Sequence, residues 1–162
     1  MNQRLRSRRM LIVTRNADQA SRARQSLLCR MCEVEIHAAQ DGSEARGWLS
    51  ARRDDLTARE CPDLIMLDLG SPASGALECL CALKQDEALR AVPVIVVAPL
   101  LPDDDVRAAY RAGAASCLPR GEEAEDLLAV IDALGDYWFG LVCLPHDGGW
   151  SPGRLGGTED RR

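Results

Sequence analysis

Three short apolar runs, at residues 10–13, 64–67 and 94–98, constrain the fold of this chain more than any other feature. No polar side chain interrupts them, and prolines flank the third run on both sides. A solid apolar run of four or five residues is typical of a parallel strand that is covered on both faces. A weaker, alternating segment at 34–38 and a short one at 115–118 complete a set of five predicted strands.

Helical patterns separate these strands, at roughly 17–31, 42–56, 75–87, 103–112 and 122–143. Strand and helix therefore alternate five times, which predicts an α/β domain with a doubly wound, five-stranded parallel sheet and helices on both faces. Connections between parallel strands of this kind are almost always right-handed.

Asp68 closes the apolar run at 64–67 and is the first candidate for a functional residue. In open α/β sheets, ligands bind and chemistry occurs at the carboxyl ends of the strands. A carboxylate at that position is therefore a candidate site.

Length and charge bound the remaining possibilities. A chain of 162 residues can bury a proper core. The net charge of −5 argues against a nucleic-acid partner. No apolar run could span a bilayer or form a signal-peptide core, so we expect a cytoplasmic protein without a membrane partner. We predict a basic, disordered segment over 1–8, one domain over 9–145 and a disordered tail over 146–162.

The element order, the segment 62–68, Pro72, Gly75, the run 93–97 and Gly113-Ala114 resemble the receiver domain of two-component response regulators. The long segment at 51–60 and the ending at 136–145 are similar to one branch, the stand-alone receivers that partner phytochrome-type histidine kinases. The resemblance implies a flavodoxin-like fold, a role in phosphorelay signalling and a histidine kinase as partner. It also implies that this chain has no enzyme activity of its own.

The resemblance also implies that Asp68 is the phosphoacceptor, assisted by an acidic pair that holds Mg²⁺, a Ser or Thr, a Lys and a switch aromatic. Phosphoryl transfer depends on positioning and charge neutralisation, so these groups matter. In this chain the five helper positions carry other residues: Thr14, Arg15, Ala98, Arg120 and Cys117. We therefore predict a degenerate pseudo-receiver with no catalytic residues, no metal site and no cofactor, which acts by protein–protein interaction.

Two alternatives stay open. One is a working receiver whose Asp68 accepts a phosphoryl group from a histidine kinase. The other is a flavodoxin-like enzyme or nucleotide binder, although no glycine-rich phosphate loop follows the first strand.

Arg15 is the most informative of the five replacements. At its family position its guanidinium would lie near Asp68 as a tethered cation in place of Mg²⁺. The alternative is that Arg15 points to solvent and Arg120 pairs with Asp68 instead. The apolar loop at 99–102 either plugs the vacated pocket or presents a partner surface.

The end of the last helix predicts a homodimer. Its apolar character continues beyond the core stripe through Tyr137, Trp138, Phe139 and Leu141. Aromatic residues anchor many protein interfaces, so we expect these four to build a twofold contact together with the helix at 103–112 and the fifth strand. The alternative is that Trp138 folds back onto its own domain.

Overall fold

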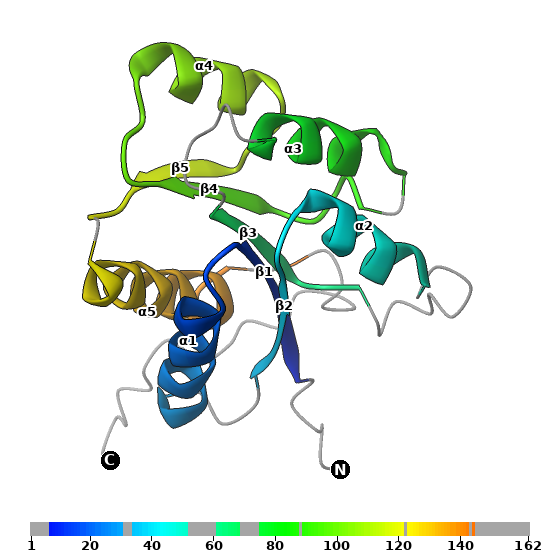
Figure 1. The fold of residues 1–162 in the computed structure, drawn as a ribbon. Helices are drawn as coiled ribbons and strands as arrows, with labels where there is room; N and C mark the ends of the chain where they lie inside the picture. Colours follow the sequence, from blue (N-terminus) through cyan, green and yellow to red (C-terminus); the bar gives the residue numbers. More distant parts are fainter. Residues whose placement is uncertain are drawn as a thin grey trace, which may run out of the picture.

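The computed structural model describes residues 7–30, 34–51, 61–68, 75–87, 89–121, 123–142 and 144. In these ranges five strands alternate with five helices along the chain (Figure 1). The elements are β1 (Arg8–Thr14), α1 (Ala17–Arg30), β2 (Val34–Ala39), α2 (Gly42–Ala51), β3 (Leu64–Asp68), α3 (Ala76–Gln85), β4 (Val94–Ala98), α4 (Asp103–Arg111), β5 (Ser116–Pro119) and α5 (Ala124–Gly140). The predicted alternation is confirmed.

The strands form one parallel sheet in the order β2–β1–β3–β4–β5. The pairing of β1 with β3 sets Thr14 opposite Asp68, and that of β4 with β5 sets Ala98 opposite Pro119. Because the strands are parallel, these four residues gather at the same end of the sheet, where the strands have their carboxyl ends.

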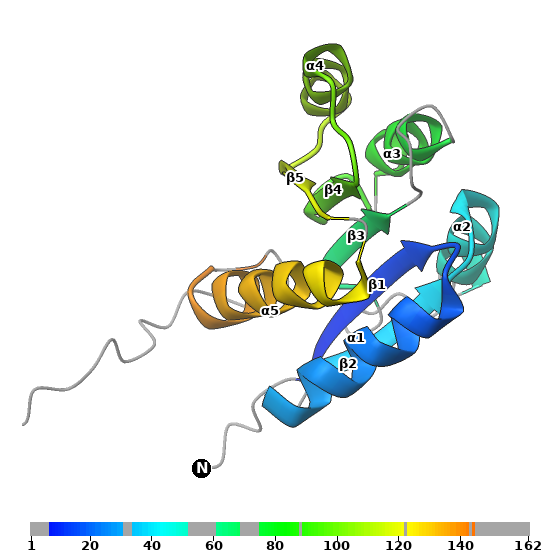
Figure 2. The same cartoon turned by 60° about the vertical axis from the view of Figure 1, so that its left-hand side comes forward.

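Helices cover both faces of the sheet, as Figures 1 and 2 show. Helices α1 and α5 lie on one face, and α2, α3 and α4 lie on the other. Successive strand residues point to opposite faces, so each buried strand supplies both layers of the core. The layer with α1 and α5 takes Met10, Ile12, Leu64, Met66, Ile95 and Val97 from the strands. The layer with α2, α3 and α4 takes Leu11, Val13, Ile65, Leu67, Val94 and Val96.

Several predicted boundaries differ from the structure by one to three residues. The disordered N-terminus was expected to include residue 8, but β1 begins at Arg8, because Arg8 pairs with Val34 of β2. The predicted helix over 42–56 is seen from Gly42 to Ala51, and residues 52–60 lie outside the described part. The predicted tail at 146–162 also lies outside it.

Side chains that the sequence places just before two helices cap their first turns. Asn16 Oδ1 accepts the amides of Asp18 at 3.1 Å and Gln19 at 3.2 Å, at the start of α1. At α2, Asp41 Oδ1 accepts the Glu44 amide at 2.8 Å, and Glu44 Oε2 accepts the Gln40 amide at 2.7 Å. These contacts satisfy backbone donors that a helix start otherwise leaves without a partner, and they fix where both helices begin.

The chain's one lysine joins three segments at the opposite end of the sheet, where the strands have their amino ends. Lys84 Nζ donates to the carbonyls of Arg90 at 3.0 Å and Val92 at 2.7 Å. A Cβ at Gly113 would lie 3.0 Å from Lys84 Cγ, and Gly113 has a φ of 104°. Burial lowers the pKa of Lys84 below its ordinary value. Lys84 therefore ties the end of α3 to the segment before β4 and to the turn before β5.

The four aromatic and apolar residues that the sequence analysis grouped at the end of α5 differ in their burial. Trp138 and Phe139 are half-buried and pack against the core layer that α1 and α5 share. Tyr137 and Leu141 are 54% and 68% exposed. The apolar extension thus partly covers its own domain and partly faces outward.

Among the described residues, none of the helices combines the length and the apolar character needed to cross a membrane.

Candidate functional site

Asp68 ends β3, one of the three inner strands of the sheet, and its residue is 2% exposed. The four residues before it, Leu64 to Leu67, are fully buried, so the strand has no freedom to slide. The apolar run thus delivers a carboxylate to the edge where the strands end, as the sequence predicted. A buried carboxylate needs a partner, because an isolated buried charge costs several kcal/mol (on the order of 5).

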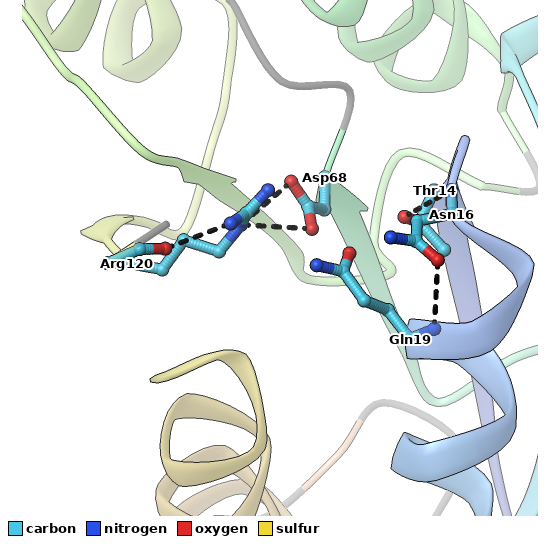
Figure 3. A network of polar contacts seen from close by, with 6 residues as sticks. Thr14, Asn16, Gln19, Asp68 and Arg120 are labelled. Atoms are coloured by element: carbon cyan, nitrogen blue, oxygen red, sulfur yellow. Dashed lines mark hydrogen bonds and ion pairs between the residues drawn. The ribbon is translucent and has the colours of Figure 1, made fainter. Parts of the chain in front are cut away.

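The guanidinium of Arg120 contacts that carboxylate, as Figure 3 shows. Arg120 Nε lies 3.2 Å from Asp68 Oδ1 and 3.1 Å from Oδ2, and the two side chains are 10% and 1% exposed. The donor and the acceptor are both charged, which makes such hydrogen bonds about twice as strong as neutral ones. The pair is shielded from water, so salt screens it less than it would a surface pair.

Two backbone carbonyls hold Arg120 in place, one through its amide and one through its guanidinium. Its amide donates to the Ala98 carbonyl at 3.0 Å, which prolongs the pairing of β4 with β5 by one residue. Its Nη1 donates to the Gly121 carbonyl at 2.9 Å, so the guanidinium is anchored to its own loop. These contacts aim Nε at Asp68 and leave it little freedom to turn away.

Arg15, the other predicted cation, follows β1 and is exposed. The tethered cation at Arg15 stays a prediction, whereas the ion pair of Asp68 with Arg120 is seen. The contact with Asp68 that the structure shows comes from Arg120.

Three polar residues line the side of the site formed by the end of β1 and the start of α1 (Figure 3). Thr14 is buried beside Asp68, and its hydroxyl accepts the Asn16 amide at 3.2 Å. Gln19 is 9% exposed and extends its amide group towards the Asp68–Arg120 pair. The sequence interpretation missed Gln19. The pattern Asn16-x-x-Gln19 is a capping box that would have drawn attention to it, although here the glutamine side chain faces the site.

The remaining predicted site residues lie on neighbouring strands. Ala98 is buried at the end of β4, so no hydroxyl is presented there. Cys117 lies on β5, partly buried against the layer under α4, and burial raises the pKa of its thiol. Leu100, in the loop after β4, is 74% exposed, so its side chain does not fill the space beside Asp68.

The residues near Asp68 supply poor ligands for a hard divalent cation. Such ions favour several oxygen ligands, chiefly carboxylates. The last position of β1 and the next one carry Thr14 and Arg15, and both Asp68 oxygens lie within 3.2 Å of Arg120 Nε. In the described part of the chain, no group of three or more His, Cys, Asp or Glu side chains is arranged to hold a metal ion.

Comparison with known proteins gives two relatives, while no protein-family model matches the chain. The probable methanogenesis regulatory protein FilR2 of Methanothrix harundinacea strain 6Ac is 35% identical over 105 residues, which are 65% of this chain. They span 66% of FilR2, slightly less than two thirds of its length. Response regulator Rcp1 of Synechocystis sp. strain PCC 6803 is 29% identical over 111 residues, 68% of this chain and 75% of Rcp1.

Two solved structures have the same fold. The phosphorylated cyanobacterial phytochrome response regulator RcpA superposes with a TM-score of 0.73 at 23% identity, covering 85% of this chain and 98% of RcpA. The Mn²⁺-bound form of Rcp1 superposes with a TM-score of 0.72 at 25% identity, covering 85% of this chain and 99% of that one. Both similarities extend over almost the whole of the known structures.

Proposed function

Because this chain belongs to the receiver-domain family of two-component response regulators, we propose that it is a pseudo-receiver that signals by protein–protein interaction. The observation that carries the proposal is the buried ion pair of Asp68 with Arg120. A phosphoacceptor carboxylate must offer an oxygen to an incoming phosphoryl group, and cations must neutralise the charge that develops. Here the guanidinium faces both oxygens before any phosphodonor arrives.

Arg120 is also a poor substitute for a movable lysine. A guanidinium cannot lose its proton, and its planar shape suits a lasting contact with a carboxylate. The Gly121 carbonyl accepts from this guanidinium, and the Ala98 carbonyl accepts from the backbone amide of Arg120. In our proposal the pair keeps the domain in one state, independent of phosphorylation.

The metal requirement supports the same proposal. The relative Rcp1 was crystallised with Mn²⁺. At the end of β1 this chain has Thr14 and Arg15, so no carboxylate is offered there as a metal ligand. We therefore propose that Mg²⁺ binds weakly at this site.

Phosphodonor labelling tests the proposal directly. The full chain is incubated with acetyl phosphate and Mg²⁺, and intact-mass spectrometry follows the added phosphoryl group. We expect negligible labelling of the natural sequence. A variant with Thr14→Asp, Arg15→Asp, Ala98→Thr and Arg120→Lys should gain labelling, and a further Asp68→Asn change should abolish it. Labelling of the natural chain at a rate like that of the restored variant would refute the pseudo-receiver.

The alternative is a receiver that is phosphorylated on Asp68. RcpA, with the same fold, was crystallised in phosphorylated form, and Asp68 is present at the end of β3 in this chain. Under this alternative Arg120 would release the carboxylate and then bind the phosphoryl oxygens. A phosphorylated histidine kinase that labels the natural chain, but not Asp68→Asn, would establish it.

We propose a histidine kinase of the phytochrome type as partner, since RcpA is a phytochrome response regulator. If the interaction does not need phosphorylation, Asp68→Asn and the natural chain should bind such a kinase with equal affinity. Isothermal titration calorimetry with a purified bacterial phytochrome kinase measures this. Loss of binding in Asp68→Asn would instead make the interaction dependent on the carboxylate.

We also propose a homodimer, built on the outer face of α5. Ala129, Ala133, Tyr137 and Leu141 recur every four residues along this face and are all exposed. A copy of the helix in the reverse direction sets Ala129 opposite Leu141 and Ala133 opposite Tyr137, so each large side chain meets a small one. This self-complementarity favours a twofold contact.

The proposed interface differs from the four residues that the sequence suggested. Trp138 and Phe139 pack within their own chain, which leaves Tyr137 and Leu141 as anchors. Sedimentation velocity should show a dimer that Tyr137→Glu with Leu141→Glu converts to a monomer. Leu100→Glu is the matched control, because Leu100 is 74% exposed but lies after β4, away from α5. A natural chain that stays monomeric at tens of micromolar would refute the dimer.

A further inference from the structure

The outer strand β5 ends the sheet on the side of α4, and among the described strands its partner is β4. The free edge of such a strand normally presents a row of backbone amides and carbonyls to the solvent. Another extended chain can pair with that row, which leads to strand addition or to aggregation. Whether another strand can pair with this edge therefore depends on whether the outward-facing backbone amides of β5 already have hydrogen-bond partners.

The direction of the amides follows from two contacts. The Arg120 amide donates to Ala98 of β4, so the amides of residues 118 and 120 point into the sheet. Residues 117 and 119 then point outward. The Cys117 amide confirms this direction, because it donates to the hydroxyl of Tyr110 at 3.3 Å, on the side away from β4.

Neither outward position leaves a backbone donor for another strand. The first donor, at Cys117, is taken by Tyr110 of α4. The second position is Pro119, which has no backbone N–H. An incoming strand could pair with carbonyls only, which removes half of the hydrogen bonds that a strand pair needs.

Tyr110 itself gains little from burial. It is 49% exposed, and the residue of α4 that is buried is its neighbour Ala109. The hydroxyl contact with Cys117 therefore accounts better for the position of this side chain than packing does. At the opposite edge, Arg24 Nη2 similarly donates to the outward carbonyl of Ile36 on β2, at 3.2 Å.

We infer that Tyr110 and Pro119 together close the β5 edge to strand addition. Partners of this domain, a second copy included, then have to recognise side chains on its helices and loops, because the backbone of β5 is not available. The inference is independent of the state of Asp68, since it rests on contacts of the outer side of β5.

Two substitutions test the inference. Tyr110→Phe removes one hydroxyl and keeps the ring, and Tyr137→Phe is the matched control, because these are the two tyrosines of the chain and Tyr137 lies on α5. Hydrogen exchange is followed by NMR at the Cys117 amide. We expect exchange to accelerate about tenfold in Tyr110→Phe, since one hydrogen bond is lost. Tyr137→Phe should leave that rate unchanged.

Self-association is measured for Tyr110→Phe combined with Pro119→Ala, which restores the second donor. The measurement uses a background with Tyr137→Glu and Leu141→Glu, so that a contact through α5 does not contribute. We expect sedimentation velocity to show association at a concentration at least about tenfold lower than in the background alone. Unchanged exchange at Cys117 would show that the hydroxyl does not hold this amide. Unchanged association would show that the edge is closed by other means, and either result would overturn the inference.

Discussion

The guanidinium of Arg120 lies against the carboxylate of Asp68 at the end of β3, with Nε 3.1 Å from Oδ2 and both side chains at most 10% exposed. The residues come from strands that are separated by β4, and 52 positions divide them in the sequence. In the proposed pseudo-receiver, this pair occupies the position of the phosphoacceptor. Its stability is therefore the quantity on which the proposed function depends.

Arg120→Ala should destabilise the protein by about 3 kcal/mol, because it leaves the Asp68 carboxylate buried without its charge partner. Asp68→Asn combined with Arg120→Ala should cost less than Arg120→Ala alone, since no charge is then stranded. Urea unfolding of the single and double variants measures the coupling. Arg15→Ala, an exposed control, should change the free energy of unfolding by less than about 0.5 kcal/mol. Strictly additive effects would mean that the contact is not energetically important.

Millimolar Mg²⁺ should leave the unfolding temperature and the tryptophan fluorescence unchanged. A ligand stabilises a protein when it binds the folded state in preference to the unfolded state. The Asp68 carboxylate already contacts Arg120, and few other oxygen ligands lie at this end of the sheet. Differential scanning fluorimetry over a range of Mg²⁺ concentrations checks this. A saturable response that disappears in Asp68→Asn would show that the site holds the metal after all.

Lys84→Met should lower the free energy of unfolding by about 1–3 kcal/mol, because the Arg90 and Val92 carbonyls lose a charged donor. Gly113→Ala should also destabilise, by about 1 kcal/mol or more, since φ is 104° and the new Cβ would press on Lys84. Gly47→Ala is the control within a helix, where a Cβ would have no neighbour within 4 Å. It should stabilise by up to about 1 kcal/mol. If Gly113→Ala behaved like Gly47→Ala, the tie between these segments would be refuted.

Burial raises the pKa of the Cys79 thiol above its ordinary value of 9.0. Above that pH the unfolded thiol ionises while the folded thiol stays protonated. The stability that Cys79 contributes is thus fully present below pH 9.0 and is lost as the pH rises through the pKa of the folded state. Cys79→Ala should make the alkaline loss of stability shallower, as measured by thermal unfolding between about pH 8 and 11. Cys81→Ala, on the exposed side of the same helix, should leave that slope as it is.

Trp138→Ala should destabilise the folded domain by about 2–3 kcal/mol, because this ring packs against the core layer of α1 and α5. Tyr137→Ala should cost less than about 1 kcal/mol, since its side chain is mostly outside the core. Chemical unfolding of both variants, carried out in Leu141→Glu to exclude a dimer contribution, makes the comparison. Equal losses would mean that the two aromatics do not divide between the core and the surface.

The strands and their order along the chain could be predicted from the sequence because their signal is local. The apolar runs at 10–13, 64–67 and 94–98 are buried on both faces, as uninterrupted runs require. The position of Asp68 followed from the same pattern, since the residue that closes a parallel strand lies where the strands end. Local signals also determined the starts of α1 and α2, where Asn16 and Asp41 cap the first turn.

Only the tertiary structure decided which side chains meet. Arg15 and Arg120 were both candidates for Asp68, and the ion pair with Arg120 depends on the packing that brings the end of β5 close to the end of β3. The same holds for Tyr137 and Trp138, which are neighbours in the sequence. The way in which α5 packs on the sheet leaves Tyr137 exposed to solvent and places Trp138 against the core. Gln19 and Tyr110 were not identified at all, because their contacts depend on where α1 and α4 pack. Sequence spacing specifies the face of an element, but packing between distant segments determines what that face touches.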